Sequence, residues 1–480
     1  MVFSDLFFLF VFLPTFLLSY LAAMWVDRQW LSTTERKSNQ AKNLILVCFS
    51  LIFYAWGEPV YVFLMLFCVL VNYLAGLMID RSDRHRKMAL VMGLVANIAI
   101  LGTFKYLGFL AQCLCDVGVP VSVPTIALPI GISFYTFQSI SYLVDVYRKE
   151  SPVQRRFPDL LLYISMFPQL IAGPIVRYGT IAEEIHKRQV TAEDFADGIY
   201  RFLIGLGKKV ILANQLSEIS DQFLVNGLNS LTTAGAWIGI VAFTLQIYFD
   251  FSGYSDMAIG LGRCLGFHFK ENFRHPYCCN SITDFWRRWH ISLGSFFRDY
   301  VYIPLGGNRQ HQAVNILVVW FLTGMWHGAS WNFIIWGVYF GLIVMIEKYT
   351  LLKVHDRIPA VFLHIYSMLL VVAGWGIFYF DNFQQMVVFF QAFFGNTASL
   401  YDFVDESALL NNFWLWIVAL FFCLPIRTTV ADWFDRWLGD SSVKTFLFFT
   451  SRVVISLGIL ILSTALLVGA TNNAFIYTRF

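Results

Sequence analysis

One histidine stands in the middle of a long apolar run, where a proton-transfer group would be conspicuous. His327 lies in the sequence Gly-Met-Trp-His-Gly at 324–328, within the run 313–346. Imidazole can accept and return a proton near neutral pH, so this position suits general acid–base chemistry. Many histidines in such runs only hydrogen-bond a neighbouring helix, and that structural role is the alternative. His290 could likewise act in general acid–base chemistry or only hydrogen-bond a neighbouring helix.

His290 belongs to the segment 248–307, which is rich in charged, aromatic and glycine residues and is flanked by apolar runs. Irregular polar backbone at membrane depth is tolerated only where protein or a water-filled cavity covers it. We therefore expect short or re-entrant helices that line a cavity, with a solvated cytoplasmic loop as the alternative. Asp284 should pair with Arg287 or Arg288, one helical turn away. The residues expected to line or support the site are Asp250, Ser252, Tyr254, Asp284, Trp286, Arg287, Arg288, Trp289 and Trp326.

Composition identifies the elements that must position these residues. Of the 480 residues, 58% are hydrophobic and 14% are charged, whereas a soluble domain has about a quarter charged residues. A bilayer accepts such runs as helices of roughly 20 residues. We expect an all-α polytopic membrane protein with about a dozen passages. The run 313–346 fits two short helices joined at depth, with His327 at the hinge.

The placement of Lys and Arg predicts the orientation in the membrane. Basic residues collect at 81–87 and again at 148–156, whereas the loop 116–124 between them has none. Cytoplasmic loops are enriched in Lys and Arg, so both basic segments are expected to face the cytoplasm. Counting spans from these loops places both the N-terminus and the tail 471–480 outside. The first run, Phe3–Trp25, is expected to be a retained span rather than a cleaved signal.

Several other kinds of site have no support in the sequence. The net charge of +3 is too balanced to predict nucleic-acid binding. The eight cysteines lie mostly in apolar stretches without CxxC spacing, so we expect inert thiols and no metal site. No GxSxG elbow, Walker loop, GxGxxG or HExxH pattern occurs. The site is therefore expected to work without a bound cofactor or metal.

Seven segments together resemble the membrane-bound O-acyltransferase (MBOAT) family, and within it the AlgI and PatA branch that serves bacterial polysaccharide O-acetylation. The similarity covers nearly the whole chain up to Ile346. The segments are Leu128–Tyr135, Ser139–Tyr142, Ala172–Pro174, Tyr248–Gly260, Phe285–Leu293, Leu305–Asn308 and Trp326–Gly328.

The resemblance implies a ring of helices around a thin central region, with a tunnel that connects the two faces of the membrane. We accordingly expect residues 1–480 to form one transmembrane domain, with a catalytic core at roughly 125–346. His327 matches the position treated as catalytic throughout the family, and His290 matches a second polar position that is Asn or His in different branches. The resemblance also implies the bacterial inner membrane as location.

The tail adds a further resemblance. Phe475-Ile-Tyr477-Thr-Arg-Phe480 is similar to the terminal aromatic motif of the small partner protein of teichoic-acid D-alanylation, where a tyrosine is implied as acyl relay. Thr478 departs from that motif, because a second aromatic residue is commoner there. An ordinary aromatic anchor at the membrane interface is the alternative for this segment.

Together these features predict an O-acetyltransferase that uses a cytoplasmic thioester, acetyl-CoA, as donor. His327 is expected to act as general base and Tyr477 as an acyl relay to the extracytoplasmic face. The expected partners are membrane lipids, an extracytoplasmic transferase or esterase of the SGNH type, and a polysaccharide acceptor such as alginate or peptidoglycan. A transporter and a non-catalytic scaffold of an exopolysaccharide complex are the alternatives.

Overall fold

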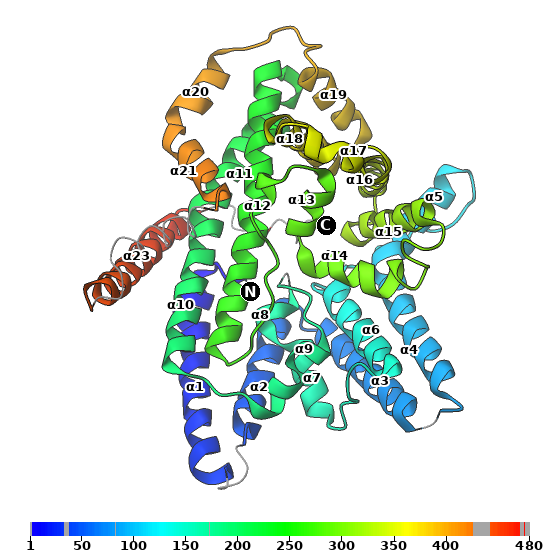
Figure 1. Cartoon of the computed structure of the whole chain (residues 1–480), viewed down its shortest axis with the longest axis vertical. Coiled ribbons are helices and arrows are strands. Elements are labelled where there is room, and N and C mark those ends of the chain that lie inside the picture. Colours follow the sequence, from blue (N-terminus) through cyan, green and yellow to red (C-terminus); the bar gives the residue numbers. More distant parts are fainter. Residues whose placement is uncertain are drawn as a thin grey trace. The chain divides into compact units, whose positions relative to one another are not determined.

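A computed structural model describes residues 2–32, 38–81, 83–171, 173–425, 442–470 and 475 of the chain. Every regular element within these ranges is a helix (Figure 1). Eight of these helices are long and apolar enough to cross a membrane, or nine if the pair Phe403–Asn411 and Phe413–Cys423, bent by 63°, is one span. The all-α polytopic fold class is thereby confirmed.

The number of such helices is lower than the dozen passages expected. The apolar segments at 125–146 and 160–176 form helices of 17 residues or fewer, namely α6 (Ile132–Arg148), α7 (Phe157–Ser165) and α8 (Phe167–Leu170). Prolines at the first turns of α7 and α8 separate these two helices from the preceding backbone. Helix α6 is buried along most of its length although it carries many polar side chains.

The described chain forms two compact units. The first comprises residues 1–202 and 255–270, and the second comprises 203–254 and 271–476. Helices α10 (Ala192–Gly207) and α12 (Thr233–Cys264) contribute residues to both. The remaining helices of the first unit are η1 (Phe8–Phe12), α1 (Leu13–Val26), η2 (Asp27–Leu31), α2 (Gln40–Gly57), α3 (Tyr61–Arg81), α4 (Arg86–Leu101), η3 (Gly102–Tyr106), α5 (Leu107–Asp116), α6, α7, α8 and α9 (Tyr178–Lys187).

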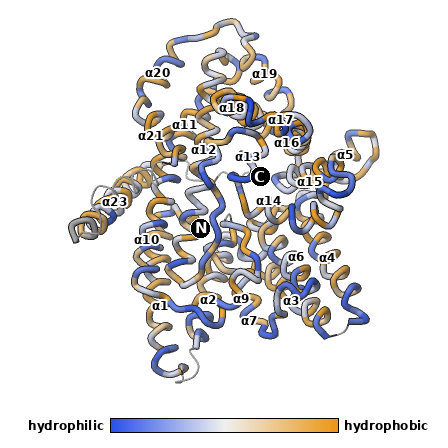
Figure 2. The backbone as a smooth tube through the Cα atoms, in the orientation of Figure 1, coloured by the Kyte–Doolittle hydropathy of each residue, from blue (hydrophilic) through white to orange (hydrophobic). Residues whose placement is uncertain are grey.

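Helices α3, α4 and α6 pack together in the first unit because small residues let them approach closely. A side chain at Gly76 would collide with Tyr142 of α6, and one at Gly93 would collide with Leu143. Asn72 and Asn97 exchange two amide hydrogen bonds, of 2.8 and 3.1 Å, between α3 and α4. Hydrophilic residues concentrate at the connection between these two helices (Figure 2).

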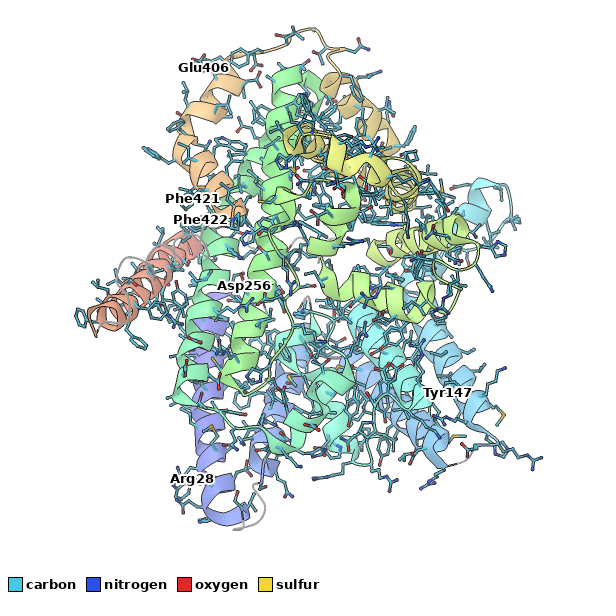
Figure 3. All side chains as sticks on the ribbon, viewed as in Figure 1. Arg28, Tyr147, Asp256, Glu406, Phe421 and Phe422 are labelled. Atoms are coloured by element: carbon cyan, nitrogen blue, oxygen red, sulfur yellow. The ribbon has the colours of Figure 1, made fainter. Side chains whose placement is uncertain are left out.

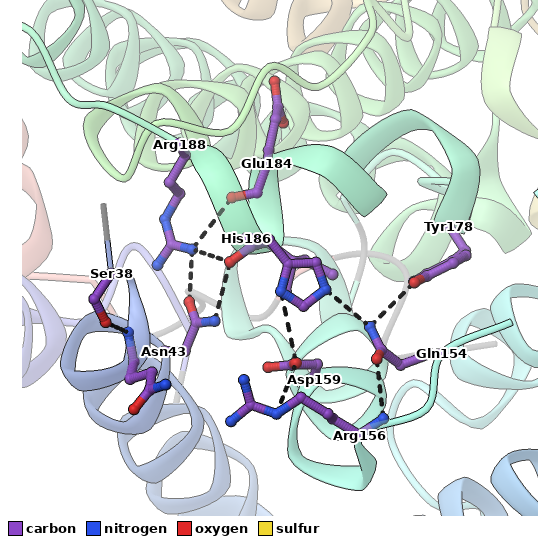
Figure 4. A network of polar contacts seen from close by, with 11 residues as sticks. Ser38, Asn43, Gln154, Arg156, Asp159, Tyr178, Glu184, His186 and Arg188 are labelled. Carbon is purple, nitrogen blue, oxygen red and sulfur yellow. Dashed lines mark hydrogen bonds and ion pairs between the residues drawn. The ribbon is translucent and has the colours of Figure 1, made fainter. Parts of the chain in front are cut away.

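Buried polar groups near α7 and α9 are held in a network (Figure 4). The Asp159 carboxylate lies 3.6 Å from Arg156 and 3.8 Å from His186. Arg188, itself buried, donates to the Asn43 side chain over 2.6 Å. Elsewhere in this unit Arg201 pairs with Asp256 of α12 over 2.8 Å. These contacts satisfy polar groups that burial would otherwise penalise.

The second unit contains every described residue of the expected site. Its aromatic side chains at Phe421 and Phe422 on α21 are exposed (Figure 3), as expected for a surface that faces lipid. Its helices, besides parts of α10 and α12, are η4 (Lys208–Ala213), α11 (Asn214–Asp221), η5 (Gln222–Asn226), η6 (Leu228–Ser230), η7 (Pro276–Cys278), α13 (Ile282–Arg288), α14 (Ile291–Phe297), η8 (Arg298–Tyr302), α15 (Gln312–His327), α16 (Trp331–Tyr349), α17 (Leu351–Val354), η9 (His355–Arg357), α18 (Ala360–Tyr379), α19 (Phe383–Phe393), α20 (Phe403–Asn411), α21 (Phe413–Cys423) and α23 (Ser442–Val468).

The break at His327 is as the sequence predicts. Helix α15 ends at His327, the backbone is extended at Gly328, and α16 begins at Trp331. The two helices pack closely because a Cβ atom at Gly324 would collide with the carbonyl of Phe333, and one at Gly337 with the carbonyl of Trp320. The run 313–346 is therefore a pair of helices joined at this histidine.

The segment 248–307 is only partly the set of short helices that we expected. Its C-terminal part contains the short helices η7, α13, α14 and η8, but Tyr248–Cys264 continues the long helix α12. The polar and small residues in this part of α12 are accommodated because neighbouring residues compensate their charge or pack closely against them. Asp250 pairs with Lys209 of η4, and Gly253 lies so close to the Gly205 carbonyl that a Cβ atom would collide.

Candidate active site in the second unit

The imidazole of His327 is surrounded by aromatic rings. Its side chain lies at the C-terminal end of α15, and the residue is 6% exposed. The rings of Trp326, Trp336 and Phe378 have centroids at 5.0, 4.9 and 5.3 Å from the His327 ring, each nearly perpendicular to it. The arrangement leaves this imidazole in an apolar, desolvated setting, where proton transfer and charge stabilisation depend on few polar groups.

His290 is brought to the same aromatic cluster. It precedes α14, is 4% exposed, and has a left-handed backbone with φ of 45°. Its ring lies 5.7 Å from Trp326, so Trp326 contacts both histidines. His290 lies between the candidate spans, and burial lowers the pKa of its imidazole to about 3. The ring is therefore neutral near pH 7, with a proton on one nitrogen and a lone pair on the other.

The backbone around His290 is held by one buried asparagine, Asn272. Its main-chain carbonyl accepts a hydrogen bond from the Ile291 amide over 2.9 Å. Its side-chain Oδ1 accepts from the Ser292 amide over 3.1 Å and from the Ser292 hydroxyl over 2.9 Å. The segment after α12 thus supplies acceptors to the first turn of α14, where amide groups have no partner within the helix.

Helix α12 contributes the residues that the sequence singled out as support. Asp250 Oδ1 lies 2.6 Å from Lys209 Nζ, and both residues are buried. Phe251, one residue further, has its ring 6.4 Å from that of His290. Ser252 and Tyr254 are also buried, with 3% and 2% exposed.

The C-terminal tail reaches this helix at one described residue. Phe475 is 2% exposed, and its ring lies 5.3 Å from Phe251 and 5.0 Å from Tyr254. Lys209 Nζ lies 5.9 Å from the centre of the Phe475 ring, a cation–π distance. Tyr477 and the rest of the tail 471–480 lie outside the described residues.

The remaining expected residues support the cluster without touching the histidine rings in the described contacts. Trp289 packs on Trp375, with ring centroids 4.9 Å apart, and Trp286 packs on Trp336 at 5.4 Å. Asp284 pairs with Arg288, with both of its oxygens 3.0 Å from Nε. The expected pairing is thus formed with Arg288; the pair is about one-third exposed, and Arg287 is exposed.

Several residues of the site were not identified from the sequence. Glu347 of α16 is fully buried and accepts hydrogen bonds from the Ile282 and Thr283 amides over 2.7 Å each, which fixes the start of α13. The two lysines in the apolar run 195–213, Lys208 and Lys209, were a signal that an acidic partner should lie nearby. The others, which had no local signal because their partners are distant in sequence, are Asn272, Trp336 and Phe378.

The chemistry available in the described part of the site is proton transfer by imidazole. Two histidines, one tryptophan between them and a wall of aromatic rings can exclude water and accept a proton from a hydroxyl group. No cluster of three or more His, Cys, Asp or Glu side chains that could hold a metal ion occurs among the residues described. The arrangement suits acyl transfer to a hydroxyl, a reaction that needs a base but no redox group.

Comparison with known proteins agrees with this chemistry. Residues 48–390 match the family model of the membrane-bound O-acyltransferases. The chain is 41% identical over 406 residues to the "Probable alginate O-acetylase AlgI" of Pseudomonas aeruginosa, covering 82% of this chain and 75% of that protein. It is 42% identical over 393 residues to the protein of the same name from Azotobacter vinelandii, covering 80% and 76%. It is 32% identical over 449 residues to the "Peptidoglycan O-acetyltransferase" of Helicobacter pylori, covering 86% and 83%. The chain belongs to the membrane-bound O-acyltransferase family.

Proposed function

We propose that this enzyme takes an acetyl group from acetyl-CoA on the cytoplasmic side and delivers it across the membrane for O-acetylation of a polysaccharide. The observation that carries the proposal is the buried cluster His327–Trp326–His290 in a chain so similar to alginate O-acetylases. A cytoplasmic thioester and an external polymer cannot meet directly, so the acetyl group must pass through the protein.

In the first step, His327 acts as general base toward the phenol of Tyr477. The phenol oxygen attacks the thioester carbonyl carbon, the imidazole takes the phenol proton, and the carbon–sulfur bond breaks. The thiolate leaves and recovers that proton from the imidazolium, so the products are a thiol and an acetyl-tyrosine. A free phenol has a pKa of about 10, which is why the attack needs a base nearby.

In the second step, a hydroxyl group on the extracytoplasmic side attacks the acetyl-tyrosine. The carbon–oxygen bond to tyrosine breaks, the acetyl ester forms on the attacking hydroxyl, and the phenol regains a proton. An extracytoplasmic partner of the SGNH type would present its own hydroxyl or that of the polysaccharide. The names of the relatives make alginate and peptidoglycan the first acceptors to test.

Phe475 supports the proposed relay because it fixes the tail two residues before Tyr477. Its ring is buried against Phe251, which in turn contacts His290. An aromatic anchor free in the membrane interface would not need such burial within the protein. The proposal places the enzyme in the bacterial inner membrane with both termini on the extracytoplasmic side.

Membership of an acyltransferase family favours catalysis over the transporter and the scaffold considered from the sequence alone. A transporter would carry the acyl donor unchanged. A scaffold would leave acetylation intact when the histidine is replaced. Only the scaffold therefore predicts that His327 is dispensable for acetylation.

The test is polysaccharide acetylation by variants at His327 and in the tail. Replacement of His327 by Ala should lower the rate by about 10²- to 10⁴-fold, the usual contribution of a general base. His355→Ala, in the short helix η9, is the matched control and should retain activity. Both variants must insert in the membrane at the level of the unmodified protein.

Mass spectrometry of the C-terminal peptide tests the relay separately. Acetyl on Tyr477 should accumulate when the acceptor is withheld and be absent in Tyr477→Phe. Phe475→Ala should slow acetylation of Tyr477, whereas Phe475→Tyr should preserve it because the ring remains. Full polysaccharide acetylation by Tyr477→Phe would refute the relay, and full activity of His327→Ala would refute the catalytic role.

A further inference from the structure

The side chain of Asn272 has only one orientation that fits its neighbours. The Ser292 main-chain amide, which can only donate, lies 3.1 Å from one terminal atom of the Asn272 side chain. That atom must therefore be the carbonyl oxygen Oδ1 rather than the NH₂ group. Asn272 is 2% exposed, so solvent does not offer an alternative partner for this oxygen.

The orientation of Asn272 determines where the Ser292 hydroxyl proton points. Ser292 Oγ lies 2.9 Å from the same Oδ1. Two oxygens at this distance repel each other unless one donates a proton, and the carbonyl has none to give. The hydroxyl therefore donates to Asn272, and its lone pairs face the other side.

On that other side, Ser292 Oγ meets Nδ1 of His290 at 3.5 Å. Since the Ser292 proton is already used, this contact is a hydrogen bond only in the tautomer whose Nδ1 carries the proton. The contact is long, as such contacts often are before a substrate binds. Nε2, on the opposite edge of the ring, is then left with its lone pair.

We propose that Asn272 and Ser292 are positioning residues that hold His290 in the Nδ1–H tautomer, so that Nε2 is its proton-accepting atom. The left-handed backbone at His290 and the edge-to-face packing of its ring on Trp326 restrict rotation of the imidazole. A backbone conformation that is rare outside glycine costs free energy and persists only where surrounding contacts enforce it. Here those contacts come from Asn272, which accepts from both Ile291 and Ser292.

This inference rests on the proposed function, because it gives His290 a task in acyl transfer. With Nε2 unprotonated, His290 can take the proton of an acyl-accepting hydroxyl in one transfer step. With the other tautomer, Nε2 would present a proton and could only donate. The hydrogen bonds from Ser292 Oγ to Asn272 Oδ1 and from His290 Nδ1 to Ser292 Oγ therefore decide whether Nε2 accepts or donates a proton.

The direct test is the nitrogen NMR spectrum of the full enzyme with its nine histidines labelled with ¹⁵N in the ring. The signals of His290 are identified by their loss in His290→Gln. A protonated Nδ1 and an unprotonated Nε2 at pH 7 are expected. A protonated Nε2 would overturn the inference, whatever the activity of the enzyme.

Variants of Ser292 connect the tautomer to catalysis. Ser292→Thr keeps the hydroxyl and should keep both the tautomer and the activity. Ser292→Ala should mix the two tautomers and lower kcat at least about tenfold, a part of what a general base contributes, with little change in the KM for acetyl-CoA. Equal activity of the Ala and Thr variants, with the tautomer changed only in Ala, would show that the tautomer does not matter for the reaction.

Asn272→Asp is a second test that does not remove the acceptor. A carboxylate still accepts from the Ser292 amide and hydroxyl, so the Nδ1–H tautomer should persist, whereas Asn272→Leu should abolish it. If the native tautomer is confirmed but His290→Gln retains full activity, the proposed role of His290 in the reaction fails while the inference about Asn272 and Ser292 stands. The two conclusions are thus separable.

Discussion

The Lys209–Asp250 pair brings two charges into an almost fully buried environment, and Lys209 lies beside the ring of Phe475. Only 5% and 1% of the two side chains are exposed. Burial of two charges costs several kcal/mol, and their attraction offsets that cost only while both are present. The intact pair therefore adds little net stability, but the removal of one partner is costly because it leaves the other charge buried.

At the residue scale, Lys209→Met should destabilise the protein by about 3–5 kcal/mol, because the buried Asp250 would lose the ammonium group that lies 2.6 Å from it. The double variant Lys209→Met with Asp250→Leu should recover most of that loss. Thermal unfolding in detergent would measure both. Arg155→Met is the control, since its pair with Asp80 is 78% and 41% exposed and should contribute at most about 1 kcal/mol. Equal effects at the two sites would contradict this account.

At the element scale, the α15–α16 hairpin determines where His327 lies. The two helices approach closely at Gly324 and Gly337, and His327 ends the first of them. The start of α13 is tied to the same hairpin through Glu347 of α16. Displacement of α16 would therefore disturb the surroundings of both His327 and the segment that leads to His290.

Gly337→Ala should accordingly destabilise the protein by about 1–3 kcal/mol, the usual cost of overpacking, because the added methyl group meets the Trp320 carbonyl. Acetyl transfer should fall as well, since the end of α15 must shift. Gly458→Ala in α23 is the matched control, because within the described part of the chain no atom outside the helix's own backbone lies within 4 Å of the added carbon. That variant should lower neither stability nor activity, and a similar loss in both variants would refute the role of the close contact.

At the scale of the whole molecule, the distribution of charge predicts how the chain is threaded through the membrane. The segment 81–87 connects the spans Tyr61–Arg81 and Arg86–Asp116 and is strongly basic, whereas 116–124 at the other end of the second span has no Lys or Arg. Basic loops are retained in the cytoplasm, so the two ends of this span should lie on opposite sides.

Alkaline phosphatase fusions test this threading, because that reporter is active only outside the cytoplasm. A fusion within 116–124 and one at the C-terminus should be active, and a fusion within 81–87 should be inactive. Fluorescent-protein fusions at the same positions, which report the cytoplasm, should give the opposite pattern. Activity of the phosphatase at 81–87 would reverse the predicted topology, and with it the proposed direction of acetyl transfer.

Much of the fold could be predicted because the length and hydropathy of each apolar segment, taken alone, show whether it can cross the bilayer. The break at His327 was predictable since the length of an apolar run can be compared directly with the thickness of the hydrocarbon region. The same local reasoning failed for Tyr248–Cys264, where polar residues suggested an interrupted backbone. The helix continues there because Lys209, far away in sequence, neutralises Asp250.

The sequence by itself determined the fold class and marked the two histidines as candidates, because hydropathy and residue type are local properties, whereas the acyltransferase chemistry followed from the resemblance of seven segments to a known family. Only the tertiary structure decided that Trp326 lies between His290 and His327, that Asn272 orients Ser292, and that Phe475 packs on α12. The physical reason is that nearly every face of these helices is apolar, so periodicity does not reveal which faces meet. Contacts between helices, and therefore the geometry of the site, depend on the packing of side chains that are distant in the chain.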